Sequence, residues 1–244
     1  MINFSIPLLL KILLKQSLSD FKSTLKVKTL LLPFFLFSSV LLIGQSSDLG
    51  NWLIAIGSKK IDNRFNWHHE IQYRNYNAIG DLEQLLLRTG VGYNLTENNN
   101  NLLLGYGFIR SENYIGFFDQ KIVVNEHRIF QQFVTKQSIG PVLLQHRYRF
   151  EQLWVEKNFR MRLRYFLAAK LPLSKEGLIP NSWYLSAYNE IFLNTEPTVF
   201  DRNRLYGGVG YKINDHFRVE LGYMNQFLDQ RNRDQVNVFL FSSF

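Results

Sequence analysis

Arginine alternates with apolar residues in the stretch FRMRLRYFL, residues 159–167. Arg160, Arg162 and Arg164 share one parity, and apolar or aromatic residues occupy the positions between them. A period of two scatters both sets around a helix but sorts them onto the two faces of a β-strand. Guanidinium groups in such a row can pair with carboxylates or hold an anion, because their planar donor fork fits both. The stretch therefore predicts a strand with one apolar and one charged face.

Charged residues in the other alternating segments follow the same rule. The polar faces of these segments carry ten arginines and five glutamates: Glu70, Arg74, Arg88, Glu126, Arg128, Arg147, Arg149, Glu151, Arg160, Arg162, Arg164, Glu190, Arg204, Arg218 and Glu220. Lysines of the chain after residue 45 fall in turns or at strand ends instead. A freely solvated face would use Lys as readily as Arg, whereas Arg suits ion pairs in confined space. We predict that these residues form a charge network inside an enclosed lumen.

Other patterns that could do chemistry are weak. His68 and His69 are adjacent, so a strand would point them to opposite faces, where they cannot easily share a metal ion. Ser residues occur in no recognisable nucleophile motif, and the repeated Gly of GVGY and GYGF precede no helix that could cradle a phosphate. We therefore expect no catalytic residues, no metal, no cofactor and no enzyme activity. An outer-membrane lipid-modifying enzyme is the least favoured alternative.

The alternating segments have the length of long β-strands and are separated by turns rich in Asn, Asp, Gly and Pro. The predicted strands are 51–58, 66–77, 83–95, 101–111, 126–137, 141–155, 158–171, 183–194, 203–213, 217–228 and 234–244. Longer connections are expected at 112–125, 172–182 and 195–202. No segment with a convincing helical period appears after residue 50.

Two architectures bury one face of so many hairpins. A soluble sandwich packs its apolar faces together, whereas a membrane barrel turns them outward to lipid and encloses the polar faces. The Arg-rich polar faces favour an all-β, transmembrane antiparallel up-and-down β-barrel of the outer-membrane type with about 10–12 strands. Because bacterial single-chain barrels have even strand numbers, the eleven segments predict either ten strands, without 51–58, or twelve. Trp52, Trp67, Tyr93, Trp154, Trp183 and Tyr211 lie near segment ends and resemble the aromatic girdles of such barrels.

The ends of the 244-residue chain agree with secretion to an outer membrane. Two lysines precede the apolar run TLLLPFFLFSSVLLIG, which predicts a cleaved signal peptide over residues 1–45 and one barrel domain over residues 46–244. A permanent N-terminal anchor is the alternative, although the run is short for a membrane span. The absence of Cys excludes a lipoprotein anchor and disulfides. Phe244 ends the last strand and resembles the C-terminal insertion signal of Gram-negative barrels.

A more particular resemblance extends over residues 50–244. The sequence carries, in order, YRNY, RTGVGYNL, GYGF, EHRIFQQF, HRYRFEQ, RMRLRYFLAAKLPL, YNEIFLN, NRLYGGVGYKI and ELGYMNQF. This succession resembles a Gram-negative outer-membrane β-barrel family known only as a domain of unknown function. The resemblance implies the fold and the cell outer membrane as location. It implies no activity, and no catalytic residue can be assigned from it.

The sequence leaves two functions open. Long Arg and Glu side chains would occlude a narrow barrel, which favours a closed or narrowly gated barrel. A small anion-preferring channel or porin is the alternative, because the lumen has more cations than anions. Expected partners are outer-membrane lipid, the barrel assembly machinery and a small anionic solute. Nucleic acid is not expected, since the net charge of +8 includes no basic run. If the last strand runs towards the periplasm, the turns at 96–101, 136–141 and 212–216 are periplasmic.

Overall fold

The structure, a computed structural model, describes residues 49–77, 80–96, 99–116, 118–229 and 231–244. The predicted signal peptide, residues 1–45, lies outside these ranges. The described residues form eleven strands: β1 (Gly50–Lys60), β2 (Phe65–Asn75), β3 (Leu82–Asn94), β4 (Asn100–Ile115), β5 (Phe118–Ile139), β6 (Val142–Val155), β7 (Asn158–Pro172), β8 (Ser182–Asn194), β9 (Phe200–Lys212), β10 (Phe217–Leu228) and β11 (Asn232–Ser243). Each predicted strand corresponds to one of them.

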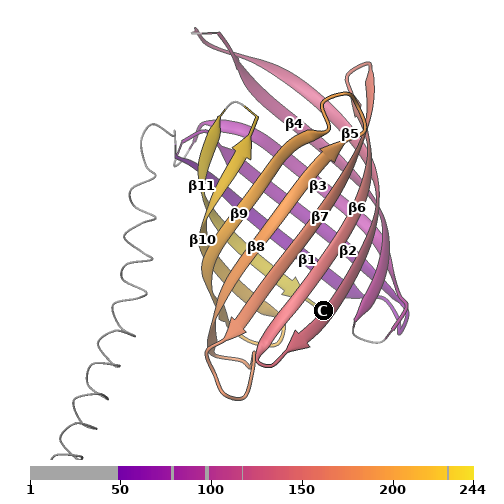
Figure 1. Ribbon diagram of the computed structural model, residues 1–244, viewed down its shortest axis with the longest axis vertical. Coiled ribbons are helices and arrows are strands. Elements are labelled where there is room, and N and C mark those ends of the chain that lie inside the picture. The colour runs from indigo at the N-terminus through magenta and orange to yellow at the C-terminus, as the bar shows by residue number, and fades with distance from the viewer. Residues whose placement is uncertain (1–48, 78–79, 97–98, 117, 230) are drawn as a thin grey trace, which may run out of the picture. The chain divides into compact units, whose positions relative to one another are not determined.

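The strands form a closed barrel in which each pairs with its neighbours in sequence (Figure 1). The prediction of an all-β up-and-down barrel is confirmed. The expectation of an even strand number is wrong, because 51–58 belongs to barrel strand β1 and the described chain has eleven strands. In an up-and-down barrel with an odd number, the first and last strands run in the same direction. They can close the barrel only by parallel pairing, which alternating hydrophobicity does not reveal.

The parallel seam joins β1 to β11 from Gly50, opposite Gln235, to Ser58, opposite Ser243. The pairing continues to the end of the chain. The amide of Phe244 donates to the carbonyl of Ser58 at 3.0 Å, and the amide of Lys60 donates to the carbonyl of Phe244 at 2.6 Å. The predicted insertion residue therefore also completes the ladder that closes the barrel.

The pairing register sorts side chains by parity into outward and inward sets. In β7, Leu163 is 49% exposed, whereas Arg162 and Arg164 are 8% and 6% exposed. Large apolar side chains are also exposed on the other strands, for example Leu221 on β10 and Trp183 on β8. The apolar face thus lies outside and the charged face inside, the reverse of a soluble sandwich.

Two predictions about the strand ends need correction. Residues 112–125 form no long loop, because β4 and β5 continue past the other strands and pair as a hairpin, with Glu112 opposite Val123 and Tyr114 opposite Lys121. This hairpin rises beyond the rim of the barrel (Figure 1). Trp52 is no girdle residue, because it is 3% exposed and lies inside the barrel. Trp67, Trp154 and Trp183 are exposed.

The strand directions assign each turn to one end of the barrel. The β3–β4, β5–β6 and β9–β10 turns lie at the end where Phe244 lies, called here the C-terminal end, as the sequence predicts. The β8–β9 connection and the β4–β5 hairpin lie at the opposite end. Within the described ranges, no helix has the length and apolarity of a membrane-spanning helix, a finding that does not concern spans made by strands.

Candidate anion-binding vestibule

Glu151 of β6 is the centre of the charge network inside the barrel. Its side chain is fully buried, and two arginines of the neighbouring strand bind its two oxygens. Arg162 donates to Oε2 through Nε and Nη2 at 3.0 and 2.7 Å, and Arg164 donates to Oε1 at 2.7 Å. Arg149 approaches the same carboxylate at 3.6 Å. Two donors of Arg162 and one of Arg164 thus hold the carboxylate in one orientation, and the cations compensate its negative charge.

A second buried carboxylate, Glu190 of β8, extends the network around the wall. Arg164 bridges the two carboxylates, because it also donates to Glu190 Oε1 at 2.6 and 3.2 Å. Arg147 donates to the same oxygen at 2.8 Å, and Arg204 lies 3.8 Å from Oε2. This connected group, spanning β6 to β9, is called here the charged wall. A separate pair on β2 and β3 joins Arg88 to Glu70 at 2.9 Å.

Aromatic rings lie against several of these arginines, including Arg74, for which the described ion pairs provide no carboxylate. The guanidinium carbon of Arg74 lies 3.8 Å from the centre of the Trp52 ring, and that of Arg149 lies 4.5 Å from the Phe130 ring. Phe192 faces both Arg164 and Arg204, at 4.3 and 4.6 Å. The ring face attracts a cation, and the attraction grows when water is excluded. Side-chain amides complete this solvation: Gln132 binds Arg149, and Gln72 and Gln84 bind Arg74.

An apolar cluster lies inside the barrel beside the parallel seam, where the polar side chains of Gln235 and Asn237 are also buried. Trp52, Ile54, Tyr206, Met224 and Phe239 form one buried cluster, called here the apolar cluster, with Ile56, Tyr188 and Phe241 packed against it. Glycines opposite the rings make this packing possible. A Cβ added to Gly222 would come within 2.4 Å of the Tyr206 side chain, so this ring packs directly against the glycine backbone.

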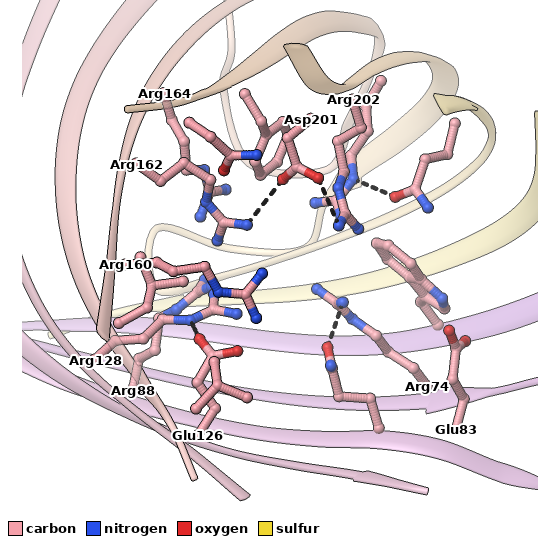
Figure 2. A pocket seen from close by; sticks show the side chains of 18 residues that line it. Arg74, Glu83, Arg88, Glu126, Arg128, Arg160, Arg162, Arg164, Asp201 and Arg202 are labelled. Atoms are coloured by element: carbon pink, nitrogen blue, oxygen red, sulfur yellow. Dashed lines mark hydrogen bonds and ion pairs between the residues drawn. The ribbon is translucent and has the colours of Figure 1, made fainter. Parts of the chain in front are cut away.

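A cavity of about 200 Å³ lies above these two regions, towards the end opposite Phe244. We call it the vestibule. It is lined by the ends of strands from around the barrel, including Arg74 of β2, Glu126 of β5 and Arg160 of β7. Figure 2 shows the three arginines of β7 on one side of the space and Arg74 with Glu83 on the other. Trp52 and Phe192 belong to its lining, so the rings that contact the arginines also form part of the cavity surface.

Positive charge predominates in the vestibule, where eight arginines and three carboxylates line the cavity among the described residues. Each carboxylate is already bound. Glu83 pairs with Arg233, Glu126 with Arg128, and Asp201 with Arg162 and Arg202 at 3.0 Å each. An enclosed space with this charge ratio has a positive potential that favours anions over cations.

The predicted site residues divide into three groups by their place in the barrel. Arg74, Arg88, Glu126, Arg128, Arg160, Arg162, Arg164 and Arg204 line the vestibule. Glu70, Arg147, Arg149, Glu151 and Glu190 belong to the ion pairs described above. Arg218 and Glu220 are not part of these pairs; Glu220 accepts a hydrogen bond from Tyr184 at 2.9 Å, and Arg218 lies 4.1 Å from the Phe241 ring.

The residues that sequence reasoning missed are mainly aromatic. Trp52, Phe130 and Phe192 lie on the inward parity of their strands, and Phe130 and Phe192 share that parity with Arg128 and Glu190. Their parity was a usable signal, because an aromatic residue on the charged face of a strand is a candidate partner for arginine. Asp201 and Arg202 were missed because they lie at the start of β9, before residue 203, where the predicted strand begins.

Metal ligation finds no support in the described part of the chain, where no group of three or more His, Asp or Glu side chains could hold an ion. His68 lies 3.6 Å from Glu70 inside the barrel. His69 contacts the exposed Trp67, with ring centres 4.8 Å apart. The two histidines therefore have separate surroundings.

Comparison with known proteins identifies the family of this chain. An uncharacterized protein of Methylorubrum extorquens is 33% identical over 164 residues, which cover 64% of this chain and 69% of that protein. No solved structure matches. The family model described as "Protein of unknown function (DUF2490)" matches residues 49–237, nearly the whole barrel. The chain, a β-barrel, therefore belongs to this family of proteins of unknown function.

Proposed function

We propose that the protein is an outer-membrane β-barrel that is closed across its middle and exposes a cationic vestibule at one end. The apolar exterior supports the membrane location. Each strand has at least 11 residues, with β1 and β2 the shortest, which is enough for a tilted strand to cross a bilayer. Phe244, at the C-terminal end, then faces the periplasm, and the vestibule opens outside the cell.

Burial of the side chains below the vestibule is the observation that carries the closed state. Phe130, Glu151 and Met224 are 0% exposed, and Phe192 and Tyr206 are 2% exposed. These residues come from β5, β6, β8, β9 and β10, so buried side chains extend from several sides of the barrel into its interior. A water-filled channel would expose such side chains, as in porins.

The alternative, a small anion-preferring channel, draws on the same positive charge. It requires a continuous aqueous path past the charged wall and the apolar cluster. The ion pairs of Glu151 and the ring contacts of Trp52 would have to separate to open one. The proposal includes no catalytic step and no cofactor.

Conductance in a planar bilayer tests the proposal. The purified protein should insert without adding measurable current, and its heat-modifiable migration on a gel should report a folded barrel. A double variant, Trp52→Ala with Tyr206→Ala, removes two large side chains from the interior and should conduct, which shows that insertion was achieved. Anion-selective current from the unaltered protein would contradict the closed barrel and establish the channel.

A further inference from the structure

The vestibule has more guanidinium groups than its own residues satisfy. Arg74 binds only amide oxygens and the Trp52 ring in its described contacts. Arg88 is 7% exposed, and its Nε–H has no hydrogen-bond partner; the Nε–H of Arg202 also has none. A buried N–H without a partner is destabilising, and more so on a charged group. These groups surround one cavity and point to a ligand that accepts hydrogen bonds.

Arg160 adds a cation that is free to meet an incoming anion. It is exposed and lines the vestibule, and none of the ion pairs in the described part of the structure includes it. In Figure 2 its side chain lies beside Arg128 and extends towards the shared space. The buried arginines below are held by Glu151 and Asp201, so a ligand would meet a fixed set of donors rather than flexible chains.

The charge, size and donor geometry of the vestibule together define the ligand. About 200 Å³ is less than the roughly 300 Å³ at which pockets begin to hold drug-sized molecules, so the ligand is small. None of the described ion pairs includes Arg74 or Arg160, so at least these two lining cations are left for a ligand with more than one negative charge. Their donors come from opposite sides of the barrel, which suits an anion whose acceptor oxygens point in all directions. A phosphate group meets these requirements better than a planar carboxylate.

We propose that the vestibule binds a small polyvalent phosphate, such as diphosphate or a phosphomonoester, that enters through the open end of the barrel. Arg160, together with Arg74, Arg88 and Arg202 of the lining, would bind its oxygens. This inference names the ligand class for the proposed cationic vestibule, but it does not depend on whether the barrel conducts. A protein that binds no phosphate could still be a closed barrel. A protein that conducts ions could still bind phosphate in the vestibule.

Isothermal titration calorimetry on the detergent-solubilised protein, at constant ionic strength, tests the proposal. Diphosphate should bind saturably with one site per chain, phosphate more weakly, and citrate, a polyvalent carboxylate, more weakly than diphosphate. Arg160→Gln should weaken diphosphate binding by about tenfold, because it removes one charged donor from the site. Because Arg160 is exposed, the variant should fold, and retained heat-modifiable migration checks this.

Arg64→Gln is the matched control. Arg64 is exposed in the β1–β2 turn at the C-terminal end and donates to Tyr93 at 3.2 Å, so this variant loses the same charge far from the vestibule. It should leave diphosphate affinity unchanged. Equal weakening in both variants would mean that only net charge matters and would overturn the site. Absence of saturable binding, or tighter binding of citrate than of diphosphate, would also overturn the proposal.

Discussion

The charged wall and the apolar cluster lie inside the same barrel but are stabilised differently. In the charged wall, Glu151 and Glu190 bind several arginines, and the Phe192 ring also lies against Arg164. In the apolar cluster beside the β1–β11 seam, Trp52, Met224 and Phe239 pack as in the core of a soluble protein. The comparison shows that an enclosed lumen does not have to be polar. The buried carboxylates of the charged wall have several partners, whereas the apolar side chains of the cluster need none.

The two regions should also respond differently to substitution. Removing one member of a buried ion-pair network leaves the other charges without compensation, which costs more than the net contribution of the pair. Removing part of an apolar side chain costs its transfer free energy and the cavity that remains. Arg204 connects the regions, because it faces Phe192 on one side and Trp52 on the other.

Glu151→Ala should give the largest loss of stability. It leaves Arg162 and Arg164 without their shared carboxylate in a buried position, and the expected loss is about 3–5 kcal/mol. Urea unfolding in lipid vesicles, followed by gel migration, measures it. Lys157→Ala, in the exposed β6–β7 turn, is the control and should change stability by about 0.5 kcal/mol or less. Similar unfolding midpoints for the two variants would contradict a confined network.

Met224→Ala should give the next largest effect, at about 2–4 kcal/mol, because Met224 is fully buried in the apolar cluster. Leu221→Ala on the same strand is the comparison. Leu221 is 58% exposed on the outer face, so lipid replaces the lost atoms and no cavity forms. In the same urea unfolding experiment, Met224→Ala should have a much lower unfolding midpoint than Leu221→Ala. The opposite order would mean that the interior of this region is loosely packed.

Arg204→Met should have a smaller effect, about 1–2 kcal/mol. The substitution removes the 2.8 Å hydrogen bond to Gln226 and the contact with Glu190, but its apolar chain can still pack on Trp52. A double-mutant cycle sharpens the comparison of the two regions. Coupling of at least about 0.5 kcal/mol with both Glu190→Gln and Trp52→Phe is expected if Arg204 connects them. Additive effects would show that the regions are independent.

Asp62 in the β1–β2 turn should give the smallest effect and serves as a baseline outside both regions. Amides of Arg64 and Phe65 donate to its Oδ1 at 2.7 Å, and these hydrogen bonds lower the pKa of the Asp62 carboxyl. A lowered folded-state pKa stabilises the fold above the unfolded pKa of about 3.9, and this contribution disappears as the pH falls through the folded value. Asp62→Ala should therefore destabilise the turn at pH 7 and have less effect near pH 3. A pH-independent difference in unfolding midpoint would contradict this cause.

The sequence predicted the strands and their orientation well because both depend on local pattern. In β7, the alternation of Arg162, Leu163 and Arg164 determines which side chains face inward, whatever the rest of the barrel does. The parallel seam was not predicted, because the even strand numbers of bacterial single-chain barrels argued against the eleven segments that the pattern indicated. The extended β4–β5 hairpin was missed because Glu112 and Tyr114 carry no alternating apolar pattern.

The vestibule was predicted only in part. Its arginines follow from the parity rule, but their arrangement around one cavity depends on the register of distant strands. The position of Trp52 could not be predicted from its place in the strand. A tryptophan near a strand end suggests an interfacial girdle, yet the register places it inside, against Arg74. Only the three-dimensional pairing distinguishes the two positions.

The orientation of the strand faces is the central claim of this account. The chain has no Cys, so a single spin label can be attached at Leu163→Cys, with Lys157→Cys in the exposed turn as the reference. In lipid vesicles, electron paramagnetic resonance should find the label at residue 163 accessible to oxygen and protected from a water-soluble nickel complex. The label at residue 157 should be accessible to nickel. Nickel accessibility at residue 163 equal to that at residue 157 would contradict the claim that the apolar face contacts lipid.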